Sequence, residues 1–306
     1  MNTKHETEVL HANWLIALPL IAWAGNALYA LGEPQGWVKD YSPALVASAL
    51  IAYVFLHGQA RYGGRALGRF VLIVFAIAWI SETISMITGF PFGNYHYTEI
   101  MAPYLWHVPV FVLPAYALMG YASWSFACLV LDRRGARPDR FALLCVPLLA
   151  ASAMVIWDLS MDPLRATLEG RWIWLDGGAH MGIPISNYLG WFGVTWLMFQ
   201  SFAAYLYLRP KHRFPKLVRS RMYWISVPLA YSAFAGEYLL NPVVGSSQLE
   251  MTLINQTLVP TNSLYADVAA LCLFTMIPLA ALGLVMALRS AASKRMVTQI
   301  GQREAR

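Results

Sequence analysis

The sequence predicts an all-α integral membrane protein, and three observations lead to that prediction. Hydrophobic residues make up 58% of the 306 residues, and charged residues make up only 12%, about half the usual share in a soluble domain. Apolar segments of membrane-spanning length follow one another along the chain. Basic residues gather in alternate loops between these segments. We therefore expect a polytopic bundle of about eight transmembrane helices that forms one domain.

Eight apolar segments are close to the roughly 17–25 residues that a helix needs to cross the hydrocarbon core. The second segment is the weakest, because His57 and Gln59 close it early. The expected organisation is an N-terminal tail over 1–13, a transmembrane bundle over 14–289 and a basic C-terminal tail over 290–306. The expected helices cover roughly residues 14–31, 43–60, 70–88, 108–131, 141–160, 186–208, 222–240 and 263–288.

The distribution of positive charge predicts the orientation of the bundle. Of the 22 Lys and Arg, only Lys39, Arg165 and Arg171 fall on one side of the expected membrane. The positive-inside rule therefore places both termini in the cytoplasm, as an even number of helices also requires. We expect the protein in the inner (cytoplasmic) membrane of the cell. The net charge of +6 then reflects topology and attraction to anionic lipid, and it does not indicate nucleic-acid binding.

Carboxylates on four of these helices are expected at one level of the membrane. With this topology Glu82, Asp158 and Glu237 lie about 18, 26 and 23 Å from the inner face of a hydrocarbon core that is about 30 Å thick. Asp267, near the outer start of the last helix, has a similar depth. The apolar segments that carry these acids contain no Lys or Arg, and an unpaired carboxyl in an apolar setting keeps its proton. Four acids in one layer indicate a site in the outer half of the membrane.

The stretch VIWDLSMDPL, residues 155–164, places Asp158 and Asp162 one turn apart on one helix face. Two carboxyls this close favour one protonated and one ionised member, an arrangement that suits acid–base chemistry. Asp158 is our first candidate for a proton donor, with Asp162 holding a water or tuning its neighbour. Glu82 and Glu237 are the next candidates. The alternative is a solvated helix end at the membrane interface.

The expected outer loops, 84–107 and 161–187, contain the two most distinctive stretches of the chain. Residues 84–100 and 168–191 are rich in Gly, Pro, Trp and Tyr and carry few charges. Such loops can fold back over the helix ends as a lid and carry aromatic side chains to the carboxylates. An interfacial belt of Trp and Tyr is the alternative explanation. The expected substrate-binding residues are Asn94, Tyr95, Tyr97, Trp157, Trp172, Trp174, His180, Asn187, Trp191 and Asp267.

Other classes of membrane protein fit the sequence less well. A retinal protein needs a lysine within a helix, and every lysine lies outside the apolar segments. A di-iron desaturase needs clustered histidine boxes, which the seven histidines do not form. His96, His107 and His180 share the outer side but lack ligand spacing, so we predict no metal site. A proton-coupled carrier of a lipophilic or small organic substrate stays the alternative, since carboxylates in membranes also relay protons.

Three motifs resemble the membrane-bound carotenoid biosynthesis family. They are SETISMITGFPFGNYHY (81–97), WDLSMDP (157–163) and WIWLDGGAHMGIPISNYLGW (172–191). The known activities of that family are the γ-carotene 1′,2′-hydratases of bacteria and the bisanhydrobacterioruberin hydratases of halophilic archaea. The likeness extends from about the third helix through the sixth, and more faintly through Glu237. His180 departs from the family pattern, which has an aromatic residue such as tyrosine there.

The resemblance implies a hydratase that adds water across the terminal C1′=C2′ double bond of an acyclic carotenoid end, with no cofactor. A neutral carboxylic acid would protonate the secondary carbon, and aromatic faces such as those of Trp157, Trp172 and Trp174 would stabilise the tertiary carbocation. Asn187 and Tyr95 would orient a water that loses its proton to a carboxylate.

The implied partners follow from this chemistry. They are a carotenoid, water and the lipid bilayer, with other carotenoid biosynthesis enzymes as candidate partners. The net basic charge favours a bacterial C40 substrate such as γ-carotene or lycopene, because proteins from a high-salt cytoplasm usually carry an acidic excess.

Overall fold

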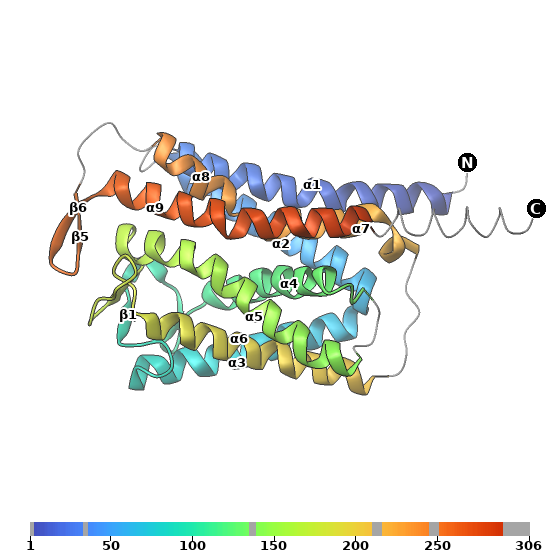
Figure 1. The fold of residues 1–306 in the computed structure, drawn as a ribbon, viewed down its shortest axis with the longest axis horizontal. Helices are drawn as coiled ribbons and strands as arrows, with labels where there is room; N and C mark the ends of the chain where they lie inside the picture. Colours follow the sequence, from blue (N-terminus) through green and yellow to red (C-terminus); the bar gives the residue numbers. More distant parts are fainter. Residues whose placement is uncertain (1–2, 33–35, 135–138, 210–215, 245–250, 290–306) are drawn as a thin grey trace, which may run out of the picture.

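A computed structural model of the chain describes residues 3–32, 36–134, 139–209, 216–244 and 251–289. Helices dominate this part of the chain and lie roughly parallel to one long axis (Figure 1). The α-helices are α1 (Thr3–Leu31), α2 (Trp37–Tyr62), α3 (Gly64–Thr88), α4 (Val112–Val130), α5 (Arg140–Asp162), α6 (Ile185–Leu208), α7 (Arg221–Tyr231), α8 (Ala235–Val244) and α9 (Thr261–Phe274).

The predicted all-α, multi-pass membrane fold is confirmed. Each of the eight predicted segments falls on helical structure, although a turn at 232–234 divides the seventh into α7 and α8. The number of eight spans and the cytoplasmic termini stay predictions, and the predicted tail 290–306 lies outside the described residues. Six helices of the described part are long and apolar enough to cross a membrane, namely Leu10–Leu31, Trp37–Tyr62, Gly64–Thr88, Val112–Val130, Arg140–Leu168 and Thr261–Arg289.

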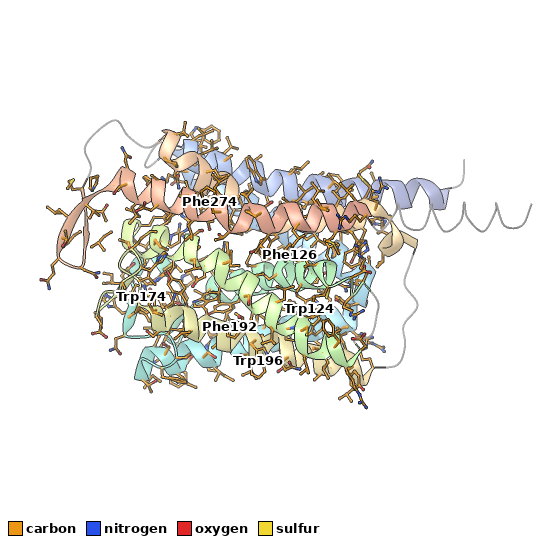
Figure 2. All side chains as sticks on the ribbon, viewed as in Figure 1. Trp124, Phe126, Trp174, Phe192, Trp196 and Phe274 are labelled. Carbon is orange, nitrogen blue, oxygen red and sulfur yellow. The ribbon has the colours of Figure 1, made fainter. Side chains whose placement is uncertain are left out.

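Helix α4 forms the centre of the bundle, and every residue from Met119 to Leu129 is buried. Its aromatic residues Trp124 and Phe126 point into the core, as Figure 2 shows. In contrast, α3 and α9 expose large apolar side chains such as Leu72 and Phe274. A surface of this kind suits contact with lipid, where apolar side chains need not be covered by protein.

The helix ends near the outer loops are set by residues with special backbone preferences. Helix α3 ends at Gly89, whose left-handed φ of 75° lets its N–H bond the carbonyl of Ser85 at 2.8 Å. Helix α5 continues past Pro163 as a π-helical turn, Pro163–Leu168. Such turns are rare and gather at functional sites. Both breaks direct the chain into the loops that cover this end of the bundle.

Short strands build those loops. Strand β1 (Tyr95–Tyr97) pairs antiparallel with β4 (Trp172–Trp174), so that two loops far apart in sequence form one ribbon. A 3₁₀ turn, η1 (Glu99–Met101), leads from β1 to a hairpin of β2 (Tyr104–Leu105) and β3 (Val108–Pro109), and another hairpin joins β5 (Met251–Ile254) to β6 (Thr257–Pro260). A further 3₁₀ turn, η3 (Lys216–Arg219), precedes α7. The β1–β4 ribbon lies at the opposite end of the bundle from the start of α1 (Figure 1).

Helix α6 approaches the first loop so closely that one position has room only for glycine. A Cβ on Gly190 would lie 2.6 Å from the carbonyl oxygen of Pro91 and 2.8 Å from Cδ1 of Phe92. Three residues later, a Cβ on Gly193 would meet nothing within 4 Å.

This contrast gives a matched test of the packing. Gly190→Ala should lower stability by about 1–3 kcal/mol through overpacking, whereas Gly193→Ala should leave it unchanged or raise it by up to about 1 kcal/mol through helix propensity. The thermal unfolding midpoints of both variants in detergent measure the difference. Equal midpoints would contradict the close approach of α6 to the loop.

Candidate active site

A cavity of about 560 Å³ lies under the β1–β4 ribbon, between the helices that carry the predicted acids. Its wall includes three carboxylates, Glu82 of α3 with Asp158 and Asp162 of α5. All three side chains are buried, with Asp158 fully inaccessible. The cavity therefore brings together acids from two helices that the sequence placed at one level.

Glu82 is held by three tyrosine hydroxyls. Tyr95 and Tyr97 of β1 both donate to its Oε2, the latter at 2.9 Å, and Tyr116 of α4 donates to Oε1 at 2.8 Å. Burial, followed by the nearby charge of Glu82, raises the pKa of Tyr95 and of Tyr97 well above the ordinary value, so both phenols remain donors. Three donors and no acceptor suit an ionised carboxylate.

The register of the ribbon explains how β1 reaches Glu82. Tyr95 is opposite Trp174 and Tyr97 is opposite Trp172, so these four rings share the face that covers the cavity. Their neighbour His96 lies on the other face and is exposed. The loops thus form the predicted lid, and alternate residues of the two strands carry its aromatic rings inward.

The aspartate pair shares a single amide. Nδ2 of Asn187, on α6, donates to Oδ2 of Asp162 at 2.6 Å and to Oδ2 of Asp158 at 3.2 Å. Trp172 donates its indole N–H to Oδ1 of Asp162 at 2.8 Å. Both oxygens of Asp162 are therefore satisfied. Oδ1 of Asp158 is buried and has no hydrogen-bond partner in the described part of the chain.

Further aromatic rings surround the carboxylates. Trp191 stacks on Tyr116 with a centroid distance of 4.4 Å and packs edge-on against Trp157 at 6.1 Å. Tyr95 packs against Trp174 at 4.8 Å, and Trp174 appears at the ribbon end of the bundle in Figure 2. All five rings line the cavity. They give it an electron-rich wall that attracts a cation.

Two arginines form the polar side of the cavity. Arg165, in the π-helical turn, is paired with Glu169 and with Glu237 of α8, and Arg171 is paired with Glu169. Tyr29 of α1 donates to Glu169 at 2.8 Å. Burial alone would raise the pKa of Glu169, but Arg165 and Arg171 hold it below the usual range. Two cations and two anions form a neutral network, which lowers the cost of burying them.

A family model described as a carotenoid biosynthesis protein matches residues 42–247, more than half of the chain. The chain belongs to the carotenoid biosynthesis protein family. No curated protein and no solved structure matches the chain. The matched range contains Glu82, Asp158, Asp162 and Asn187, together with the ribbon that covers them.

The structure places most of the predicted site residues around this cavity. Besides the three carboxylates, the predicted residues that line it are Tyr95, Tyr97, Trp157, Trp172, Trp174, Asn187 and Trp191. Among the described residues, no three His, Cys, Asp or Glu side chains are grouped so that they could hold a metal ion.

Four predicted residues do not line the cavity. Glu237 lies behind Arg165, so the expectation that no cation pairs with it is wrong: an arginine from the outer loop reaches back into the bundle. Asp267 is exposed, because the buried stripe of α9 runs through Thr261, Leu264, Val268 and Cys272 and leaves position 267 outside it. Asp267 therefore does not join the other acids at the cavity.

The other two hold the loops in place. Asn94 is exposed and donates to Asp176 at 2.7 Å, which joins the first loop to the second. His180 contacts the carbonyl of Leu159 through Nε2 at 3.1 Å. Neither side chain lines the cavity.

Four residues at or next to the cavity were not predicted from the sequence, namely Tyr29, Tyr116, Arg165 and Arg171. Tyr116 lies in a strongly apolar helix, where one hydroxyl among many apolar residues gives no pattern. The two arginines did give a signal, because they are two of the only three basic residues on the expected outer side. Because basic residues are so rare on that side and several acids are close in sequence, ion pairs between these arginines and the acids could have been expected.

The ion pair at the cavity predicts a strong coupling between two helices. Glu237→Gln and Arg165→Met should each lower the free energy of unfolding by about 3–5 kcal/mol, because each leaves a buried charge unbalanced. The double variant restores neutrality and should be more stable than the sum of the two losses predicts. Unfolding of the four proteins in detergent measures the coupling, and strictly additive losses would contradict it.

The tyrosine contacts predict that Glu82 holds the lid. Glu82→Gln replaces an acceptor oxygen with an N–H donor, so the amides of β1 and β4 should exchange hydrogen faster. His96→Gln is the matched control, because it changes the exposed face of the same strand and should leave exchange unchanged. Equal protection in Glu82→Gln and the unaltered protein would show that the lid is held by other contacts.

Proposed function

We propose that the chain is a carotenoid hydratase. It would add water across the terminal C1′=C2′ double bond of an acyclic end group of the γ-carotene or lycopene type and produce a tertiary alcohol. Membership of the carotenoid biosynthesis family supports the substrate class. The reaction type is the one that the resemblance implies, and the chemistry of the cavity supports it.

The observation that carries this proposal is the state of Asp158. Asp158 lines the cavity, its Oδ1 is buried and no described residue bonds it, while both oxygens of Asp162 and both of Glu82 accept hydrogen bonds. A carboxyl with an unsatisfied oxygen next to an ionised neighbour is the member of the pair that holds a proton. Asp158 is therefore our proton donor.

In the first step, Asp158 transfers its Oδ1 proton to the secondary carbon C2′. The π electrons of the double bond form the new C–H bond, and a positive charge develops at the tertiary carbon C1′. Trp157, Trp174 and Trp191 present the aromatic wall that stabilises this cation, by about 2 kcal/mol or more per desolvated contact. The carboxylates of Glu82 and Asp162 add favourable charge.

In the second step, a water held near Asp162 and Asn187 attacks C1′. The new C–O bond completes the alcohol, and the water passes its extra proton to Asp162. Because both aspartates bond the same amide of Asn187, the proton returns from Asp162 to Asp158 over a short path. One water is consumed, and both carboxyls end in their starting states.

Under this proposal, Glu237 is a positioning residue. It holds Arg165 at the polar side of the cavity, where the paired charges exclude apolar groups and leave room for water. Tyr95, which we expected to orient the water, bonds Glu82 and would act by placing that carboxylate.

The proposal predicts the fate of pigments in bacteria that make lycopene or γ-carotene and express this chain. Liquid chromatography with mass spectrometry should find a more polar pigment heavier by one water, with an unchanged polyene absorption spectrum. Asp158→Asn should abolish this product, because an amide does not supply the proton.

Asp132→Asn is the matched control, since Asp132 is exposed on the far end of α4 and already has the positive φ that Asn tolerates. It should make the hydrated pigment at the level of the unaltered protein. Near-normal product from Asp158→Asn would exclude Asp158 as donor. Unchanged pigments with the unaltered, folded protein would exclude the hydratase and direct testing to a proton-coupled carrier.

A further inference from the structure

The cavity extends away from the carboxylates to a gap between two helices. On α2 its wall includes Pro43, Ala44 and Ala47, and on α4 it includes Phe111 and Ala115. Pro43, Ala44, Phe111 and Ala115 are also exposed. The same residues thus face both the cavity and the surroundings, which means that the cavity opens there.

Small side chains keep this gap open. Apart from Phe111 and the exposed Asp40 in the first turn of α2, the residues named on its rim are alanine or proline, and these are too short to reach across to the facing helix. Deeper in the cavity, the wall continues with Leu50 on α2 and Leu118 on α4. Beyond Asp40, the passage from the gap towards Glu82, Asp158 and Asp162 is therefore apolar.

We expect the surroundings of the gap to be lipid. Both α2 and α4 are among the helices long and apolar enough to cross a membrane, and the rim residues lie within the first three turns of α2 and the first turn of α4. An opening between two such helices faces hydrocarbon, where an apolar molecule is already dissolved.

Another part of the cavity wall is unsuited to an apolar molecule. It carries Arg165 and Arg171 in their network with Glu169, and the β1–β4 ribbon covers it. Passage there would separate paired charges from one another, at a high cost in free energy. Of the two sides, only the gap matches the chemistry of a hydrocarbon.

The size of the cavity also requires an opening for an elongated substrate. A volume of about 560 Å³ holds a ligand of ordinary drug size. A C40 polyene extends over a length comparable to the roughly 30 Å hydrocarbon core. Only an end group fits inside, so the rest of the polyene must leave through a gap.

We propose that the gap between α2 and α4 is a lateral portal through which one end of a polyene enters the cavity from the bilayer. The inference rests on the proposed function for the identity of the occupant. The end group reaches Asp158, and the remaining chain lies in lipid beside α2 and α4. Pro43, Ala44 and Ala115 determine the width of the portal.

The test narrows the portal from either helix. Ala44→Trp and Ala115→Trp, made separately, should each lower the yield of hydrated pigment by about tenfold or more. Ala76→Trp is the matched control, because Ala76 is exposed on α3 and does not line the cavity. It should keep the yield within about twofold of the unaltered protein. Thermal unfolding in detergent confirms that each variant is folded.

A second measurement separates the portal from the chemistry. Purified Asp158→Asn protein in nanodiscs is mixed with lycopene, and binding is followed by the circular dichroism that a bound polyene shows in the visible range. The two portal variants, combined with Asp158→Asn, should lose this signal, and the Ala76→Trp combination should keep it. This readout does not depend on hydration.

A third variant acts after folding. Ala44→Cys in detergent can be modified with a bulky thiosulfonate and restored with a reductant, so polyene binding should disappear and return. The unaltered protein controls for Cys128, Cys145 and Cys272, of which the first and last are buried.

The outcomes are distinct. One outcome is that the unaltered protein makes no hydrated pigment but binds lycopene, and that the portal variants block this binding. That outcome would contradict the proposed hydratase and support the portal. Normal hydration and binding in both portal variants would overturn the portal and keep the hydratase.

Discussion

The site depends on how Glu82 satisfies its charge inside an apolar bundle. A carboxylate removed from water must find donors or lose its charge, and Glu82 finds three phenols from two separate elements. Two of them lie on β1, so bonding the carboxylate also fixes this strand over the cavity. The pairing of β1 with β4 then places Trp172, which donates to Asp162. One buried acid thus determines where the lid lies and how a second acid is oriented.

The bundle uses two different solutions for its buried acids. Glu237 is neutralised by Arg165, whereas Glu82, Asp158 and Asp162 receive only neutral donors, from tyrosine, tryptophan and asparagine. A cation next to the aspartate pair would favour two ionised carboxyls and would repel a developing carbocation. Neutral donors avoid both effects. Arg165 and Arg171 pair with Glu169 and Glu237 and do not pair with Asp158. The proposed proton donation from Asp158 to a hydrocarbon depends on this arrangement.

Much of this arrangement could be predicted from the sequence, because membranes impose simple rules. Long apolar segments gave the helices, and acids in them gave the cavity wall of Glu82, Asp158 and Asp162. Two predictions were wrong, one because the sequence does not show which face of a helix is buried, and the other because it does not show how far a side chain reaches. Asp267 was expected at the same depth as the other acids, but it lies off the buried stripe of α9. The depth of a residue carries no information about which way its helix is rotated. Arg165 belongs by sequence to a loop, yet the π-helical turn returns it to the bundle.

The position of the portal follows from the same separation of charge. Under the proposal the cavity has an opening towards lipid, and another part of its wall is closed by paired charges, so its two reactants would contact different parts of the wall. A polyene arrives through small side chains without leaving hydrocarbon, and water is retained near Asn187 and the arginines. The tertiary alcohol carries one added hydroxyl on a long apolar chain, so it too can return to the bilayer by the portal. A single opening then serves both substrate and product, and the lid that Glu82 holds can remain closed throughout the reaction.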